Sequence, residues 1–222
     1  YVTKPIASQI DIEKNLFKKQ TLMKPNISAV IPTYNDYLYL PSIVEQISKS
    51  KYSPQIIVVD DGSNAQTKQT LSNIKNITLV TNHTNLGKTK ALEKGFLSAT
   101  GDILVMVDSD ITNFAAHHFD SLISPLLDAK ADIILGCREK EDYHSRLFGY
   151  AWSYTGERAF SKEFFSHAKK DLFSGTGYQF ECRFNRLAFH RFSTHGVILA
   201  GVGQIPLNKK HGLIGWKKYL EQ

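Results

Sequence analysis

The residues of this chain best placed to do chemistry are two aspartates at the end of a short apolar run. Residues 103–107 are wholly apolar and are followed by Asp108, Ser109 and Asp110. The run lacks alternation and is too short for a helix, which is typical of a buried parallel strand, and open α/β sheets bind ligands at the carboxyl ends of such strands. Residues two apart in an extended segment point to the same side, so both carboxylates can bind one hard cation and leave its other positions to phosphates. A solvated Asp-rich turn is the alternative for an isolated motif.

Polar residues also follow two other apolar runs. Asp60 and Asp61 come after the run 55–59 and precede Gly62, which permits a tight turn. A carboxylate there can accept hydrogen bonds from a nucleotide base or ribose; alternatively, Asp61 or Ser63 caps the next helix. The run 27–31 is followed by residues that form either the neighbouring wall of this site or an ordinary turn: Pro32, Tyr34 and Asp36.

The segment Asn85-Leu86-Gly87-Lys88-Thr89 is similar to the end of a phosphate-binding P-loop. A P-loop, however, needs glycine five positions before the second glycine, and the chain has Asn82 there. A side chain at that position obstructs the close backbone approach to phosphate, so P-loop hydrolysis is not expected. Lys88 at a helix start remains suited to meet a diphosphate.

The elements that position these residues alternate along the chain. Apolar runs predict strands at 27–31, 55–59, 77–80, 103–107 and 132–136. Amphipathic patterns predict helices between them at 38–50, 65–74 and 88–99. Alternation with short connections indicates an α/β fold, a Rossmann-like, mostly parallel sheet flanked by helices. The second half is expected to hold one or two helices within 146–170, a helix at 178–189, a short strand at 203–207 and a helix start at 216–220.

Composition and charge bound the class of protein. The 222 residues are 42% hydrophobic and 22% charged, which suits one globular domain. The two cysteines, Cys137 and Cys182, have no spacing typical of a disulfide framework or metal site. Residues 1–136 hold 13 basic and 13 acidic residues, whereas residues 137–222 hold 14 and 8 and supply the whole net charge of +6. A basic second part suits phosphate-bearing substrates, acidic lipid or nucleic acid, or is merely a solvated surface.

Four motifs in order resemble the family 2 inverting glycosyltransferases with the GT-A fold. They are 29–35 (AVIPTYN), 58–63 (VVDDGS), 85–88 (NLGK) with Ala91 and Gly95, and 108–110 (DSD). The resemblance implies a UDP- or GDP-linked sugar donor, with Asp60 or Asp61 near the base. It also implies Mn²⁺ or Mg²⁺ on the diphosphate, bound by Asp108 and Asp110, where it stabilises the departing charge as a Lewis acid and makes Asp110 catalytic. The other residues implied in nucleotide-sugar binding are Pro32, Tyr34, Asp36, Gly87, Lys88 and Ser109.

The second half resembles the polyprenyl-phosphate branch, the dolichyl- and undecaprenyl-phosphate sugar synthases, in segments 136–138, 177–181 and 204–212. This resemblance implies a lipid-phosphate acceptor, which is already an anion and needs cationic groups rather than a strong base. A saccharide or protein hydroxyl would instead need a general base, for which Glu181 is the catalytic candidate. Glu181 can equally be a surface residue paired with Arg183 or Arg186. The candidates for binding the acceptor are Arg138, Arg146, Lys209 and Lys210.

Together these patterns predict a single GT-A domain over 1–222, made of an N-terminal extension (1–26), a nucleotide-sugar-binding part (27–136) and a basic, helical acceptor-side part (137–222). No apolar stretch reaches the ~20 residues that span a bilayer. The expected location is cytoplasmic, either peripheral to the membrane or anchored on its cytoplasmic face through segments outside this chain, in cell-envelope polysaccharide synthesis.

Two more distant functions stay open. A nucleotidyltransferase also uses an α/β sheet with paired carboxylates, but releases pyrophosphate. A basic nucleic-acid-binding domain is disfavoured because the sheet part is neutral and its acids lie at strand ends, so no nucleic acid is expected.

Overall fold

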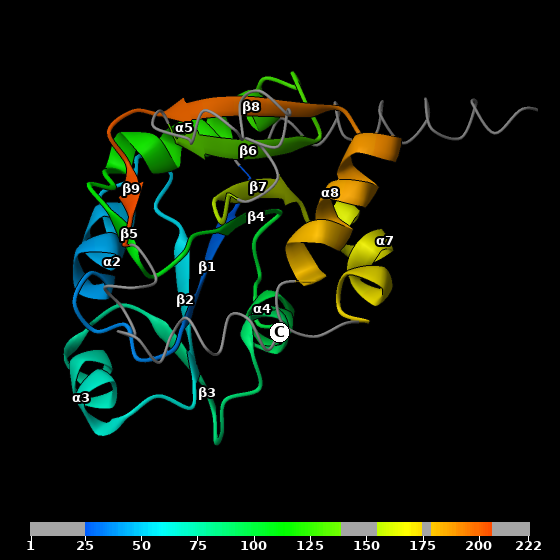
Figure 1. Cartoon of the computed structure of the whole chain (residues 1–222). Coiled ribbons are helices and arrows are strands. Elements are labelled where there is room, and N and C mark those ends of the chain that lie inside the picture. Colours follow the sequence, from blue (N-terminus) through cyan, green and yellow to red (C-terminus); the bar gives the residue numbers. More distant parts are fainter. Residues whose placement is uncertain (1–24, 139–154, 175–178, 206–222) are drawn as a thin grey trace, which may run out of the picture.

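The computed structural model describes residues 25–138, 155–174 and 179–205. In this part of the chain, seven strands form one sheet in the order β3-β2-β1-β4-β7-β6-β8 (Figure 1). Only β7 runs antiparallel to its neighbours; the other described pairs are parallel. The strands are β1 (Ile27–Thr33), β2 (Gln55–Asp61), β3 (Thr78–Asn82), β4 (Ile103–Met106), β6 (Ile133–Arg138), β7 (Arg158–Ser161) and β8 (Thr194–Leu199).

Helices cover both faces of this sheet and enclose two cores (Figure 1). One face carries α2 (Leu40–Ser48), α3 (Ala65–Asn73) and α5 (Ala116–Leu127), which pack on the sheet through aliphatic side chains and Phe119. The other face carries α4 (Lys88–Leu97), α7 (Lys162–Leu172) and α8 (Gln179–Arg191). The buried rings of Phe96 on α4 and of Phe180 and Phe184 on α8 pack with Phe160 on β7, with ring centroids 5.2–6.3 Å apart.

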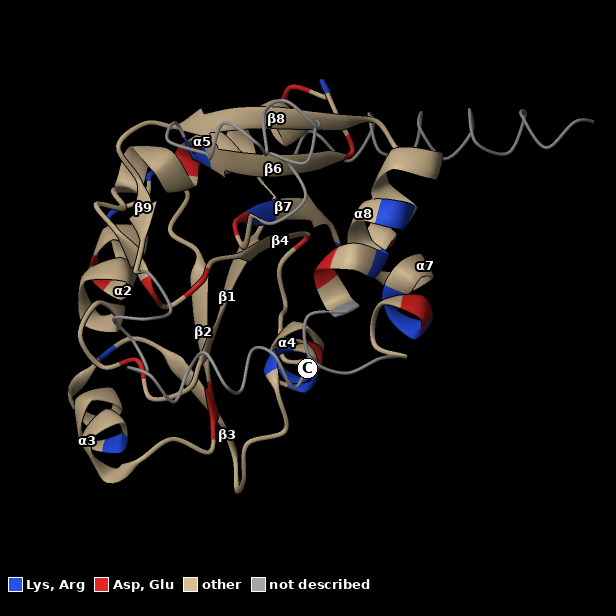
Figure 2. Ribbon diagram, viewed as in Figure 1, with Lys and Arg blue, Asp and Glu red and all other residues tan. Residues whose placement is uncertain are grey.

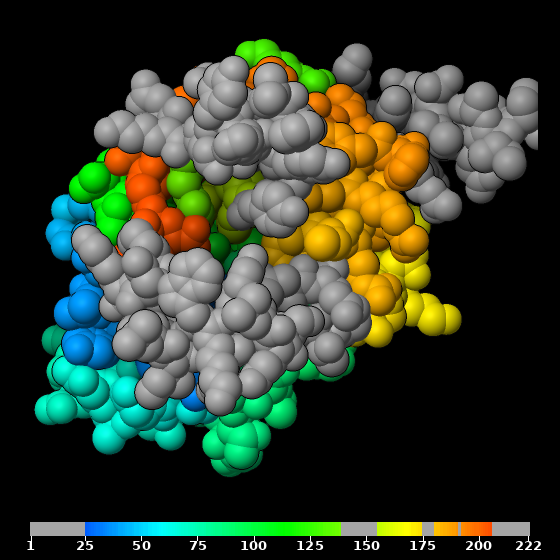
Figure 3. All heavy atoms as spheres, in the orientation of Figure 1, coloured from blue at the N-terminus to red at the C-terminus, as the bar shows by residue number. Residues whose placement is uncertain are grey.

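Two short strands form a separate two-stranded sheet outside the main one. β5 (Ile111–Thr112) pairs antiparallel with β9 (Gly203–Gln204), so that Ile111 lies opposite Gln204. This pairing brings the chain beyond β8 back to the residues that follow β4. In Figure 3 the orange-red atoms of β9 lie left of the centre and the orange atoms of α8 lie on the right.

The predicted α/β class and mostly parallel sheet are confirmed, and the five strands and three helices predicted in the first half agree within a few residues. Of the one or two helices predicted within 146–170, α7 is found from Lys162 onward, but 158–161 is the antiparallel strand β7 and 146–154 lie outside the described residues. α5, β5 and β8 were not predicted: Pro125 lies inside α5, and β8 mixes exposed and buried residues without an apolar run. The predicted helix start at 216–220 lies outside the described residues.

Within the residues that the structure describes, no helix is both long and apolar enough to cross a bilayer.

Candidate active site

The predicted site residues gather at the edge where the parallel strands end. β7 is antiparallel, so its start lies at this same edge, and Arg158 pairs with Met106 at the end of β4. Figure 2 shows acidic and basic ribbon segments meeting at the start of β7. Asp108 and Asp110 lie just beyond β4, each only 8% exposed. They lie past the end of the strand, at a turn, so the reasoning that an extended segment aims both carboxylates to one side is corrected.

Lys88, in the first turn of α4, joins two of the predicted acidic residues. Its Nζ lies 2.7 Å from Asp108 Oδ1 and 2.8 Å from Glu181 Oε1. Burial opposes the charged ammonium, but the two carboxylates outweigh it and raise the pKa of Lys88 above its usual range. Three residues from three separate motifs therefore form one ion-paired cluster.

Glu181 is held in this cluster rather than on the helix surface. It is 7% exposed, and its Oε2 is buried with no hydrogen-bond partner among the described residues. Arg183 donates instead to the Asp171 carbonyl and to Ser174. The alternative of a surface glutamate is therefore wrong, since Glu181 pairs with Lys88.

The segment before β7 approaches Asp108 closely, which the sequence did not indicate. A Cβ on Gly156 would lie 1.9 Å from Asp108 Oδ2, so only glycine fits there with Asp108 in this position. Next to it, Glu157 is fully buried and accepts hydrogen bonds from Arg138 Nη2 at 3.1 Å and Thr155 Oγ1 at 2.9 Å. Burial raises the pKa of Glu157, Arg138 opposes that rise, and the nearby charge of Asp108 adds to it.

Asp110 is held by two consecutive side-chain contacts, from Arg138 to Gln204 and from Gln204 to Asp110. Gln204 Nε2, on β9, lies 3.2 Å from both carboxylate oxygens of Asp110. Arg138 Nη1 donates in turn to Gln204 Oε1 at 2.7 Å. Arg138, predicted to bind the acceptor, thus contacts Glu157 and Gln204, and the other acceptor candidates lie outside the described residues: Arg146, Lys209 and Lys210.

A buried arginine anchors the start of β7 below this cluster. Arg158 is fully buried, and its Nε donates to the Thr155 carbonyl at 3.0 Å. Its Nη1 donates to Asn185 on α8, and its guanidinium lies 4.8 Å from the centre of the Phe184 ring. Burial lowers the pKa of Arg158. This arginine ties β7 to the helix that carries Glu181.

On the donor side, Asp61 shapes the loop that presents Lys88. Its carboxylate accepts hydrogen bonds from Asn82 Nδ2 at 2.7 Å, the Leu86 N–H at 3.0 Å and the Gly87 N–H at 2.8 Å. Gly87, at the N-cap of α4, has φ +87°, a value that favours glycine. Asp61 therefore fixes the loop by its own hydrogen bonds.

Asp60 and the turn after β1 complete this wall. Asp60 Oδ1 accepts from the Ser63 N–H at 2.9 Å, and the cap of α3 is Asn64, so the alternative of a cap by Asp61 or Ser63 is wrong. Ser109 Oγ donates to Asp36 Oδ2 at 2.8 Å, which ties the turn to the aspartate motif. Two of the predicted residues differ in exposure: buried Pro32 within β1 and exposed Tyr34.

The donor set at the edge suits a hard divalent cation. Asp108 and Asp110 offer carboxylate oxygens, the ligands that hard divalent cations prefer. The described residues contain no group of three or more His, Cys, Asp or Glu side chains arranged to hold a metal ion. The protein ligands fit a cation whose remaining positions are filled by a phosphate-bearing ligand and water.

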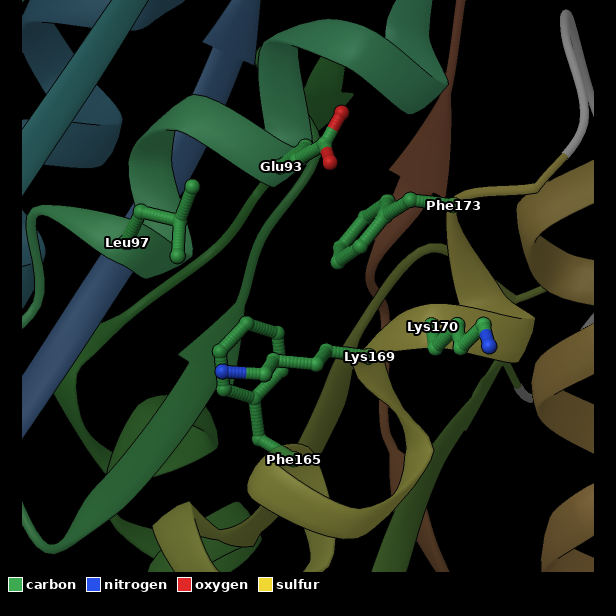
Figure 4. A pocket seen from close by; sticks show the side chains of 6 residues that line it. All are labelled: Glu93, Leu97, Phe165, Lys169, Lys170 and Phe173. Atoms are coloured by element: carbon green, nitrogen blue, oxygen red, sulfur yellow. The ribbon is translucent and has the colours of Figure 1, made fainter.

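A separate hollow of about 280 Å³ lies between α4 and α7, and Asp108, Lys88 and Glu181 are not among its lining residues (Figure 4). Its walls are apolar rings and aliphatic chains with charged ends: Glu93, Leu97, Phe165, Lys169, Lys170 and Phe173. None of these residues belongs to the four sequence motifs.

Comparisons with known proteins show the family and the fold of the chain. Residues 28–193 match the family described as Glycosyl transferase family 2. An undecaprenyl-phosphate 4-deoxy-4-formamido-L-arabinose transferase of Pectobacterium atrosepticum is 35% identical over 97 residues, 40% of this chain and 30% of its own. A dolichyl-phosphate beta-glucosyltransferase of Trichomonas vaginalis is 28% identical over 152 residues, 60% of this chain and 45% of its own. The matches thus span less than half the length of these relatives.

Among solved structures, the fold is similar to glucosyl-3-phosphoglycerate synthase from Mycobacterium tuberculosis, crystallised with Mn²⁺, UDP and glucosyl-3-phosphoglycerate. The TM-score is 0.66 at 23% identity, over 86% of this chain and 76% of that one. This likeness confirms the GT-A-like fold. The family match covers most of the described sheet and its flanking helices. The chain therefore belongs to glycosyl transferase family 2.

Proposed function

We propose that this chain transfers a sugar from a nucleoside-diphosphate sugar to a polyprenyl phosphate, with inversion and with the help of Mn²⁺ or Mg²⁺. One observation carries the proposal: Asp108, at the carboxyl end of β4, is buried beside Asp110, with Lys88 and Glu181 paired next to it. A leaving diphosphate gains negative charge as it departs, and both the Lys88 ammonium and a divalent cation bound by the carboxylates would stabilise that charge.

On the donor side, the bound cation supplies Lewis-acid stabilisation of the leaving diphosphate. Asp108 and Asp110 are the residues that would hold it, and Gly156 and Gln204 keep their carboxylates in place. Lys88 stands at the start of α4, where backbone N–H groups also favour anions. Asp60 and Tyr34 are the candidates for contact with the base. The named relatives and the UDP-bound neighbour support this choice of donor class.

The acceptor choice rests on the second half of the chain. Residues 137–222 carry the whole net charge of +6, which suits a phosphate acceptor at an anionic membrane surface. The names of the undecaprenyl-phosphate and dolichyl-phosphate relatives support the same class. Glu181 Oε1 is already bonded to Lys88, so this oxygen is poorly placed to take a proton. The cluster therefore suits an acceptor that arrives deprotonated.

A second candidate is transfer to a saccharide or protein hydroxyl. It is favoured by the buried, unpartnered Oε2 of Glu181, which can accept a proton. The two candidates predict different effects of Glu181→Gln. The amide keeps the shape of Glu181 but cannot act as a base, so transfer to a hydroxyl should be lost while transfer to a phosphate should be kept.

The test is transfer from labelled UDP- and GDP-sugars to undecaprenyl or dolichyl phosphate in lipid vesicles, with Mn²⁺ or Mg²⁺, and in parallel to soluble saccharides. Labelled lipid with the anomeric configuration opposite to that of the donor, formed by wild type and retained within about tenfold by Glu181→Gln, supports the proposal. Product on a hydroxyl acceptor alone, lost by 10²-fold or more in Glu181→Gln, supports the second candidate and contradicts the first.

A further inference from the structure

Lys88 lies where it would compete with the proposed divalent cation for the Asp108 carboxylate. Its Nζ lies 2.7 Å from Asp108 Oδ1, an oxygen on the residue proposed to bind the divalent cation. Carboxylate–metal distances are roughly 2.0–2.2 Å for ions such as Mg²⁺. An ammonium and a dication on one carboxylate would lie within a few ångströms of each other and repel strongly.

We propose that Lys88 is a resident counter-ion of Asp108 that the divalent cation must displace, so that cation binding and release of Lys88 are one coupled event. The inference rests on the proposed function, because it takes Asp108 as a cation ligand. In the cation-free protein Lys88 compensates part of the negative charge of Asp108 and Glu181, and in the loaded protein the ammonium moves away from Asp108 while Glu181 remains its partner.

The surroundings show which member of the pair can move. Gly156 lies against the Asp108 carboxylate, where a single added methyl would collide, so this side chain has little free space. Glu181 lies in the first turn of α8, which the neighbouring Phe180 and Phe184 anchor in the aromatic core. The Lys88 side chain is 23% exposed and has four flexible methylene groups, so it is the member free to swing.

Charge also explains why a lysine is found here. Asp108, Glu157 and Glu181 are each at most 8% exposed, and their mutual repulsion is relieved by the Lys88 ammonium on this side of the cluster. The two carboxylates raise the pKa of Lys88, so the ammonium stays charged at any neutral pH. A counter-ion of this kind lowers the affinity of the site for a divalent cation, because the cation must displace the ammonium in order to bind Asp108.

The test compares Mn²⁺ binding without nucleotide or sugar, by isothermal titration calorimetry and by the electron paramagnetic resonance signal of free Mn²⁺. Lys88→Met removes the competing charge and nearly keeps the shape, and is expected to bind Mn²⁺ at least tenfold tighter than wild type. Lys88→Arg keeps the charge and should stay within about threefold of wild type. The matched control is Lys90→Met, on the same helix but exposed and paired with half-buried Glu93, which should change nothing.

Thermal unfolding guards against misreading a poorly folded variant. Without Mn²⁺, Lys88→Met should melt below wild type, because two buried carboxylates lose their partner, and Mn²⁺ should raise its melting temperature more than that of wild type. Equal or weaker Mn²⁺ binding by folded Lys88→Met overturns the inference. If Asp108→Asn still abolishes Mn²⁺ binding in that case, the proposed cation site stands and only the competition fails. Binding unaffected by Asp108→Asn overturns both.

Discussion

Replacing Gly156 by alanine tests whether the close approach of the pre-β7 segment positions Asp108. The added Cβ would lie 1.9 Å from Oδ2 and 2.2 Å from Cγ of Asp108, against ordinary contact at 3.4 Å or more. Either the carboxylate or the start of β7 must move by about 1.5 Å. A misplacement of ~1 Å in a catalytic group can reduce the rate by roughly 10²-fold, and overpacking costs about 1–3 kcal/mol of stability.

The assay is steady-state transfer together with Mn²⁺ affinity and urea unfolding for the same preparations. Gly156→Ala is expected to lose about 10²-fold in kcat/KM and to bind Mn²⁺ more weakly. Gly201→Ala is the matched control: with φ +74° it strains the backbone, but its Cβ meets no neighbouring atom. It should lose comparable stability and keep Mn²⁺ affinity. A folded Gly156→Ala with wild-type turnover and Mn²⁺ affinity would refute the positioning of Asp108 by this glycine.

Three further predictions follow from the contacts around the site. Asp61→Ala leaves the Asn82 amide and the Leu86 N–H without an acceptor and removes one of the two acceptors of the Gly87 N–H, and it should lower the free energy of unfolding by about 3 kcal/mol in urea titrations; a loss below ~1 kcal/mol would contradict the loop's dependence on Asp61. Gln204→Ala removes the amide that holds Asp110 and should weaken Mn²⁺ binding by about tenfold or more, so unchanged affinity would contradict its role. Burial lowers the pKa of His118, which caps α5 by accepting the Ala115 N–H, so below pH ~6.5 the unfolded chain takes up the proton first and stability falls. Melting temperatures at pH 7.5 and 5.5 should therefore differ more for wild type than for His118→Gln, and equal differences would contradict this.

The sequence predicted the donor half of the molecule well because its signals are local. Most strands of that half contain a continuous apolar run, β3 being the exception, and Asp60, Asp61 and Asp108 follow such runs directly. Since carboxyl ends of parallel strands share an edge, the approximate meeting place of these residues follows from topology alone. The ion pair of Lys88 with Asp108 and Glu181 is a contact across three motifs, and only the packing of α4 and α8 fixes it.

The contacts that residues 155–158 and Gln204 make around the aspartates could not be predicted from the sequence, because they depend on tertiary partners. Residues 155–158 (TGER) hold charges and a glycine ahead of only two apolar residues, which is typical of a loop or helix surface rather than a buried strand start. Here Glu157 and Arg158 are fully buried because tertiary partners satisfy them. Gln204 reaches Asp110 only through the pairing of β5 with β9, which joins segments more than 90 residues apart. The charged pair Glu157 and Arg158 next to Gly156 is visible in the sequence, but the sequence does not indicate which residues this segment contacts.

The central claim is a nucleoside-diphosphate-sugar site completed by a divalent cation on Asp108 and Asp110. Its most direct test is the thermal unfolding of wild type and Asp108→Asn with UDP, GDP, CDP and their sugars, each with and without Mn²⁺. At about 100-fold over its Kd a true ligand stabilises the fold by ~2.7 kcal/mol, a shift of roughly 5–10 °C for a chain of this size. We predict such a shift for at least one nucleotide, dependent on Mn²⁺ and lost in Asp108→Asn. No Mn²⁺-dependent shift with any nucleotide, or an equal shift in Asp108→Asn, would contradict it.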